Sequence, residues 1–148
     1  MSQENEVAFC GLYCGTCVIR QGRLAHFAGQ LLKSMKSADF TKLADGLPSI
    51  HPELMSDFKK SNTAIDVLTA MLHLDCTKSC RDGGGSSACK IRQCCQGKAI
   101  AGCWMCDHTD HCETLAWLEP VNKDAHLKNI KLIQTKGMQA FLDGEKFW

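Results

Sequence analysis

Eleven cysteines occur in this chain of 148 residues, and most of them fall in short, closely spaced groups. Thiols at such spacings either form disulfides or hold metal ions, and both uses tie together distant parts of a chain. The cysteine count is odd, and the first residues are polar and acidic, without the basic start and apolar run of a signal peptide. We therefore expect a cytoplasmic protein whose reduced thiols bind metal, with a disulfide framework as the alternative.

Two of the cysteine groups have the CxxC spacing, in which a tight turn brings both sulfurs to one ion. These are Cys14-Gly15-Thr16-Cys17 and Cys103-Trp104-Met105-Cys106. The predicted metal ligands are Cys10, Cys14, Cys17, Cys76, Cys80, Cys89, Cys94, Cys103, Cys106 and Cys112. Structural zinc takes four thiolate or imidazole ligands in a tetrahedron, so these thiols suffice for two sites. The sequence leaves open which cysteines share an ion.

The side chains next to these cysteines have weaker claims to a metal. Cys95 lies beside Cys94, and because adjacent residues seldom bind the same ion we interpret Cys95 as a buried apolar residue. His108 and His111 lie within the last group and could replace a sulfur, but solvated loop histidines are the preferred interpretation. Trp104 lies inside a CxxC pair, where its ring would shield the site from water.

Other chemistries for the same thiols remain open. Cys10, Cys14 and Cys17 have the CxxxCxxC spacing that holds an iron–sulfur cluster, although the ferredoxin run of cysteines is absent. Cys14 and Cys17 could also perform thiol–disulfide chemistry, but no βαβ pattern surrounds them. A catalytic zinc needs an open position and a general base, and no catalytic residue is identifiable. We expect zinc in structural sites of a binding or interaction module, with an iron–sulfur cluster as the alternative cofactor.

Composition argues against two classes of partner. The net charge is +1 with acidic and basic residues intermixed, so no basic stripe predicts nucleic-acid binding. No apolar run is long enough to span a membrane. Hydrophobic residues make up 45% of the chain, which is enough for one domain with a buried core. We predict a single domain over residues 1–148, with metal-binding segments at 10–17 and 76–112 and with partners unknown.

Apolar periodicity predicts an all-α fold, a small helical domain with a loop-rich, metal-stapled cysteine region. Residues 18–36 predict an amphipathic helix. Its expected buried face comprises Leu24, Phe27, Ala28, Leu31 and Met35. Shorter helices are predicted to open at Pro52 and near Ser61, over 88–98, over 110–120 with a stop at Pro120, over 122–137 with Gly137 as terminator, and from Met138. The run Gly83-Gly84-Gly85 lacks the Gly-Lys-Ser/Thr of a phosphate loop and is interpreted as a flexible linker.

The cysteine motifs, taken together, are similar to those of a known family. The motifs are Cys10-Gly11-Leu12-Tyr13-Cys14-Gly15-Thr16-Cys17, then Cys76 and Cys80, Cys89-Lys90-Ile91-Arg92-Gln93-Cys94, Cys103-Trp104-Met105-Cys106 and Cys112-Glu113-Thr114-Leu115. In this order they resemble domain of unknown function family 3795, small cysteine-rich proteins of bacteria and archaea. The resemblance implies a zinc-binding protein without an established activity. The chain departs from the family pattern at Ser79, at Asp110-His111, and at Cys95, a place usually held by alanine.

Overall fold

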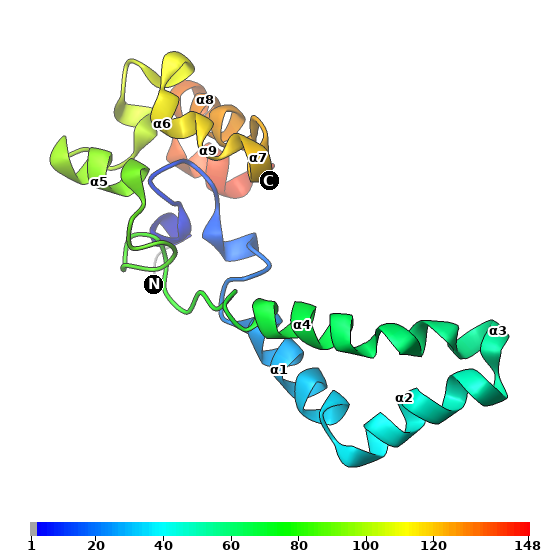
Figure 1. Ribbon diagram of the computed structural model, residues 1–148. Helices are drawn as coiled ribbons and strands as arrows, with labels where there is room; N and C mark the ends of the chain where they lie inside the picture. The colour runs from blue at the N-terminus through cyan, green and yellow to red at the C-terminus, as the bar shows by residue number, and fades with distance from the viewer. Residues whose placement is uncertain (1–2) are drawn as a thin grey trace. The chain divides into compact units, whose positions relative to one another are not determined.

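The regular secondary structure of the chain is almost entirely helical. A computed structural model describes residues 3–148, in which extended backbone pairs at two isolated bridges, Val7 with Tyr13 and Arg20 with Cys76. The all-α prediction is therefore confirmed. The structure divides into two compact units, which can be followed by residue colour in Figure 1. The cysteine unit comprises residues 3–20 and 76–148, and the insert unit comprises residues 21–75.

Short helical segments alternate with loops in the cysteine unit. Its 3-10 turns are η1 (Gln3–Glu6), η2 (Cys14–Thr16), η4 (Cys103–Met105) and η5 (Thr109–His111). Its α-helices are α5 (Lys90–Gly97), α6 (Glu113–Ala116), α7 (Glu119–Asn122), α8 (Ala125–Lys136) and α9 (Met138–Asp143). Segments this short are marginal on their own, because the first turn of a helix is costly to form. Side-chain contacts and loop hydrogen bonds must therefore fix most of this unit.

The core of the cysteine unit is built around α8. Ile130 on α8, Leu115 on α6 and Phe141 on α9 are all buried. Asn129 is fully buried beside them, and its side-chain amide both donates to and accepts from the backbone of Phe147, each bond being 3.0 Å long. A buried amide whose donor and acceptor are both hydrogen-bonded adds directional contacts to an otherwise apolar core. This pair of bonds holds the C-terminal segment against α8.

The insert unit is made of longer helices with a thin core. Its elements are α1 (Arg23–Met35), α2 (Ala38–Ile50), α3 (Pro52–Met55), η3 (Ser56–Lys60) and α4 (Ser61–Met71). In Figure 1 α1 runs beside α4, and the two helices pack against each other. The buried residues of these elements are Ala28, Leu32, Met35, Ala44 and Pro48. Helix α4 buries no residue completely, so this unit has little apolar stabilisation of its own.

Helix α1 differs from its prediction in its start and in its buried face. It begins at Arg23, because Gln21 and Gly22 have φ angles of 68° and 63°, in the left-handed region that a right-handed helix excludes. Phe27 and Leu31 are 58% and 52% exposed. The buried stripe instead contains Ala28, Leu32 and Met35. The predicted periodicity is therefore correct, whereas the predicted face is wrong for two of its five residues.

The other helix ends agree with the sequence signals only in part. Pro52 opens α3 and Gly137, at φ 86°, ends α8, so both predictions are confirmed. Pro120 was expected to stop a helix but lies in the first turn of α7, where a proline loses no hydrogen bond. Helix α2 lies outside every predicted helix. Its signal is Ser37, whose hydroxyl accepts a hydrogen bond from the amide of Phe40 (3.2 Å).

Two predictions concern the chain as a whole. Within residues 3–148, every helix is too short or too polar to cross a membrane. The division into two compact units does not by itself decide whether the chain is one domain, so the single domain over residues 1–148 stays a prediction.

Candidate functional site

Cys10 lies in a tight turn at the start of the cysteine unit. The amide of Gly11 donates to the carbonyl of Ala8 (2.9 Å), and the amide of Ala8 donates to the carbonyl of Leu12 (2.8 Å). Gly11 has a φ of 84°, and a Cβ at this position would lie 2.9 Å from Cγ1 of Ile130 on α8. Both the backbone conformation and the close approach to α8 therefore require glycine. The turn carries the Cys10 side chain into the core.

Four thiols gather around this turn from separate parts of the sequence. We name Cys10, Cys14, Cys80 and Cys89 the first thiol group. Burial, together with the charges of the other three thiols, raises the pKa of Cys10 from 9.0 to about 12. Burial, with the charge of Cys80 added, likewise raises the pKa of Cys14 to about 11. These thiols are close enough that ionising one makes ionising the next less favourable, unless a cation balances the charge.

Backbone amides act on three of the sulfurs in the first thiol group. The amide of Leu12 lowers the pKa of Cys10, and the amide of Cys80 lowers that of Cys14. The amide of Phe9 lowers the pKa of Cys80 in the same way, although burial is the larger effect and raises all three. Hydrogen bonds from N–H groups favour the charged thiolate. Metal-bound thiolates commonly accept such bonds, which orient them.

Arg92 on α5 fixes the loop that brings Cys80 into the group. Its buried guanidinium donates to the carbonyls of Cys80 (3.2 Å), Gly84 (2.8 Å) and Ser86 (2.6 Å). A buried charge is tolerated because all three contacts are hydrogen bonds to backbone oxygens. Cys89, at the start of α5, is therefore held in register with Cys80 by the helix that carries Arg92. No local sequence pattern singles out Arg92.

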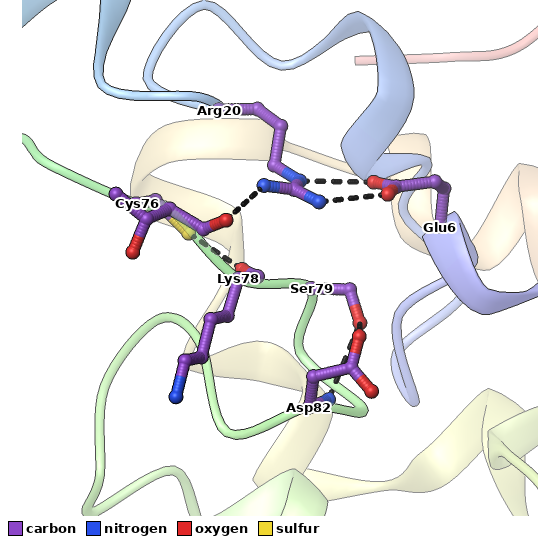
Figure 2. Close-up of polar contacts among 7 residues, drawn as sticks. Glu6, Arg20, Cys76, Lys78, Ser79 and Asp82 are labelled. Carbon is purple, nitrogen blue, oxygen red and sulfur yellow. Dashed lines mark hydrogen bonds and ion pairs between the residues drawn. The ribbon is translucent and has the colours of Figure 1, made fainter. Parts of the chain in front are cut away.

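The glycine-rich run is an ordered turn within this loop. The amide of Gly84 donates to the carbonyl of Ser79 (2.7 Å), and the Ser79 hydroxyl contacts Asp82 Oδ2 (2.7 Å), as Figure 2 shows for the Ser79–Asp82 pair. A Cβ on Gly84 would collide with the backbone carbonyl of Lys78. Glycine at this position therefore serves a close backbone approach. This differs from the flexible linker that composition predicts.

An ion pair holds the start of the loop to the N-terminal segment. Arg20 donates to both carboxylate oxygens of Glu6 (3.0 and 2.8 Å) and to the carbonyl of Thr77 (2.6 Å). Figure 2 shows this pair beside Cys76, which bridges to Arg20. The thiol of Cys76 donates to the carbonyl of Lys78 (3.2 Å). Cys76 therefore takes part in the hydrogen bonding of the loop and lies outside the first thiol group.

A second set of sulfurs lines a cavity of about 120 Å³. We name its cysteines the second thiol group: Cys94, Cys95, Cys103, Cys106 and Cys112. His108 and His111 line the same cavity and are both exposed. The two CxxC pairs of the sequence thus contribute to different groups, because Cys14 belongs to the first and Cys103 to the second. Sequence spacing alone could not have separated them.

Cys95 and Cys103 form the closest contact within the second thiol group. Their sulfurs are 3.7 Å apart, and the two side chains are 1% and 8% exposed. The hydrogen bond between them lowers the pKa of Cys95 and raises that of Cys103. The amide of Cys103 also donates to the carbonyl of Phe9 (2.8 Å), next to the first thiol group. The prediction that Cys95 is buried is confirmed, but its sulfur has a specific partner.

Arg81 connects the segments that carry the two groups. Its guanidinium donates to the carbonyls of Val7 and Ala101, both at 2.8 Å. It also lies over two aromatic rings, 4.9 Å from the centroid of Phe9 and 5.4 Å from that of Trp104. Such cation–π contacts are favourable where the cation is partly desolvated. Trp104 packs against the core, and its role in excluding water from a metal stays a prediction.

The remaining predicted ligands lie at the margins of these groups. Cys17 follows Cys14 in the same turn, where the amide of Cys17 donates to the carbonyl of Cys14 (3.0 Å). Cys94 is exposed, in contrast to Cys95. Across residues 3–148, no three His, Cys, Asp or Glu side chains converge so that they could hold a metal ion. The thiols therefore lie near one another without forming a complete coordination site. The ten ligand assignments stay predictions.

His126 on α8 is a further candidate residue that no sequence motif marks. This residue is fully buried, and both of its ring nitrogens lack a hydrogen-bond partner among the described residues. It lines a cavity of about 230 Å³ together with His111, Cys112 and Glu119. Burial lowers the pKa of His126, so the ring is neutral at ordinary pH. A single histidine on an apolar helix face is a weak signal, because such residues usually serve the core.

Comparison with known proteins places the chain in a family. No curated protein and no solved structure matches it. The model of the family described as "Protein of unknown function (DUF3795)" matches residues 6–117, a range that includes every cysteine of the chain. The family suspected from the cysteine motifs is thus confirmed. On the strength of a match over most of its length, this chain belongs to the DUF3795 family.

Proposed function

We propose that this protein is a zinc-binding module in which the ions hold the loops of the cysteine unit in place. The first ion is bound by Cys10, Cys14, Cys80 and Cys89. The second is bound by Cys103, Cys106 and Cys112, with a fourth ligand from Cys94, His108 or His111. The protein then acts as an interaction module, presenting a surface to a partner, and its sites perform no chemistry.

The observation that carries this proposal is the gathering of the first thiol group within one core. Burial makes Cys10, Cys14 and Cys80 harder to ionise, and the neighbouring thiols add to that cost. A divalent cation reverses both effects, because a thiol that coordinates zinc is deprotonated outright. The backbone amides that act on Cys10, Cys14 and Cys80 favour the same charged state. Four neighbouring thiols, of which Cys10 is buried and the others partly buried, three of them with amide donors, suit zinc better than they suit a metal-free core.

Zinc binding would draw the thiols of each group together. A tetrahedral site needs four sulfurs at about 2.3 Å from one ion. The first-group sulfurs lie on the opening turn, on the Arg92-held loop and at the start of α5, so closure of a site would require these three segments to move toward one another. Apparent binding free energies for structural zinc are about 10–16 kcal/mol, which is large beside the stability of a small domain. This supports a structural role.

The composition of the first group favours zinc over the iron–sulfur alternative. That alternative rests on the CxxxCxxC spacing of Cys10, Cys14 and Cys17. The charges of Cys80, Cys14 and Cys89 act on Cys10, whereas Cys17 acts on Cys14 with a smaller effect than that of Cys80. Four thiolates in a tetrahedron suit zinc, although iron bound by four sulfurs shares this ligand set. Metal identity is therefore part of the test.

The exposed apolar surface of the insert unit supports an interaction role. Its exposed large hydrophobic residues are Phe27, Leu31, Leu43, Ile50, Leu54, Val67, Leu72 and Leu74. Contiguous apolar patches on soluble proteins often mark interaction sites. The other unit exposes fewer residues of this kind, among them Trp117 and Val121.

The proposal is tested by the metal content of two matched variants purified without oxygen. Cys14→Ser removes a ligand of the first group, whereas Cys17→Ser changes a cysteine of the same turn outside it. We expect Cys14→Ser to lose about one zinc per chain and Cys17→Ser to keep the wild-type content. Equal zinc content in Cys14→Ser and wild type would reject the first site. Iron and sulfide in the wild-type protein would reject zinc itself.

A further inference from the structure

Cys95 is the member of the second thiol group that the proposed zinc sites leave unused. It lies on α5 and is buried, and its sulfur is 3.7 Å from that of Cys103 at the start of η4. A buried cysteine without a partner is simply a small apolar residue. A second thiol in contact with it makes oxidation to a disulfide possible.

We propose that Cys95 and Cys103 are a redox site, at which hydrogen peroxide or a similarly small hydroperoxide converts the two thiols into a reversible disulfide. The inference goes beyond the proposed zinc sites and does not need them. If zinc does bind the second group, the disulfide would withdraw Cys103 from it.

The short separation of the two sulfurs suits such a bond. A disulfide needs its sulfurs about 2.05 Å apart, so the pair must approach by less than 2 Å, which is within reach of side-chain rotation. The two residues are eight apart in sequence. The chain turns back between them, since the amide of Ile100 donates to the carbonyl of Cys95 (3.0 Å). The closed loop is therefore short, and the bond requires no rearrangement of distant segments.

The small volume of the cavity favours a small oxidant. Both cysteines line the cavity of about 120 Å³, and a water molecule occupies about 30 Å³ in the liquid. Hydrogen peroxide, with two oxygen atoms, fits such a space. A tripeptide disulfide such as oxidised glutathione does not fit and could reach these sulfurs only after local opening. A small peroxide is therefore the class of oxidant that reaches this pair most readily.

The chemistry balances with peroxide as the sole oxidant. One thiolate attacks a peroxide oxygen, the O–O bond breaks, and the hydroxide that leaves takes up a proton to become water. The resulting sulfenic acid is attacked by the second sulfur, the S–O bond breaks, and a second water leaves with the proton of that thiol. Two electrons pass from the two sulfurs to the peroxide. A dithiol reductant returns the pair to its starting state.

The test maps disulfides in the full-length protein after brief exposure to hydrogen peroxide. Reduced protein, with and without prior chelation of metal, is oxidised, alkylated and digested with trypsin, which cuts after Lys98 and so separates Cys95 from Cys103. We expect a cross-link between these two residues by fragment-ion mass spectrometry, reversed by dithiothreitol. Oxidised glutathione should form it more slowly, on the order of tenfold, because access limits the exchange. An equal rate with both oxidants would overturn the assigned oxidant.

Two adjacent cysteines provide matched variants. Cys94→Ala, at an exposed position, should leave the cross-link intact, whereas Cys95→Ala should abolish it. If Cys95 stays open to alkylation after unfolding while other cysteines oxidise, with and without chelation, the redox site is rejected. This alkylation measurement needs only the wild-type chain, so it stays valid even if a variant folds poorly. Zinc measured in the same samples separates the two proposals, because a cross-link in a zinc-free protein would support this one alone.

Discussion

The two units of this protein differ in what holds them together. All eleven cysteines lie in the cysteine unit and none lies in the insert unit. The cysteine unit relies on buried polar contacts, such as those of Arg92, Arg20 with Glu6, and Asn129. The insert unit relies on the packing of α1 against α4 and of α2 against η3, with much of its apolar surface exposed. On the proposed function, metal would therefore stabilise the cysteine unit and leave the insert unit unchanged.

The largest expected difference between the units appears on chelation. Removing zinc from the anaerobically purified protein should raise amide exchange in the cysteine unit on the order of a thousandfold, because the loops lose their cross-links. The insert unit has no cysteine and should keep its helical protection. Hydrogen exchange read by mass spectrometry measures both units in one sample. An equal increase of amide exchange in the two units would contradict the proposed difference between them.

The next largest effect is the pH dependence of the metal-free protein. The pKa of Cys10 is raised from 9.0 to about 12, so the folded state holds a proton that the unfolded state releases. The contribution of this protonated thiol to the stability of the folded state is fully present below pH 9.0 and is lost as the pH rises toward 12. The free energy of unfolding should fall by about 4 kcal/mol over this range, at 1.36 kcal/mol per pH unit. Urea unfolding of wild type and Cys10→Ala measures it, and parallel pH profiles would refute the assignment.

Arg92 tests the polar contacts of the cysteine unit, and the exposed Arg23 of the insert unit serves as its control. Arg92→Met leaves three carbonyls in the loop without their donor and should lower the free energy of unfolding of the cysteine unit by about 3 kcal/mol. Arg23→Met, at the exposed start of α1, should change stability by less than about 0.5 kcal/mol. Urea denaturation compares the two. A neutral Arg92→Met would show that the loop is not held by this side chain.

The smallest effects come from two glycines, and we expect opposite signs. Gly84→Ala places a methyl group against the carbonyl of Lys78 and should destabilise the cysteine unit by about 2 kcal/mol. Gly46→Ala, within α2, meets nothing within 4 Å and should stabilise the insert unit by about 0.5–1 kcal/mol. Thermal melts of both variants measure the difference. The same sign in both would contradict the assigned surroundings of these glycines.

The sequence predicts the local features of this protein better than their arrangement in space. The CxxC pairs identify the cysteines as a cluster, and the signals of Pro52 and Gly137 locate two helix ends, because these are local properties of the chain. The grouping of Cys10 with Cys89 depends on a loop held by Arg92, a contact that no local pattern encodes. Similarly, the face that α1 buries is decided by its partner α4, and periodicity alone cannot set that rotation.

The most direct test of the account is X-ray absorption on protein purified without oxygen. We predict a signal at the zinc edge, with a first shell dominated by sulfur at about 2.3 Å and with zinc present at about two ions per chain. That result would mean that the gathered thiols close around zinc as structural ligands. Iron with sulfide, a first shell of oxygen or nitrogen, or a protein without metal would contradict the account.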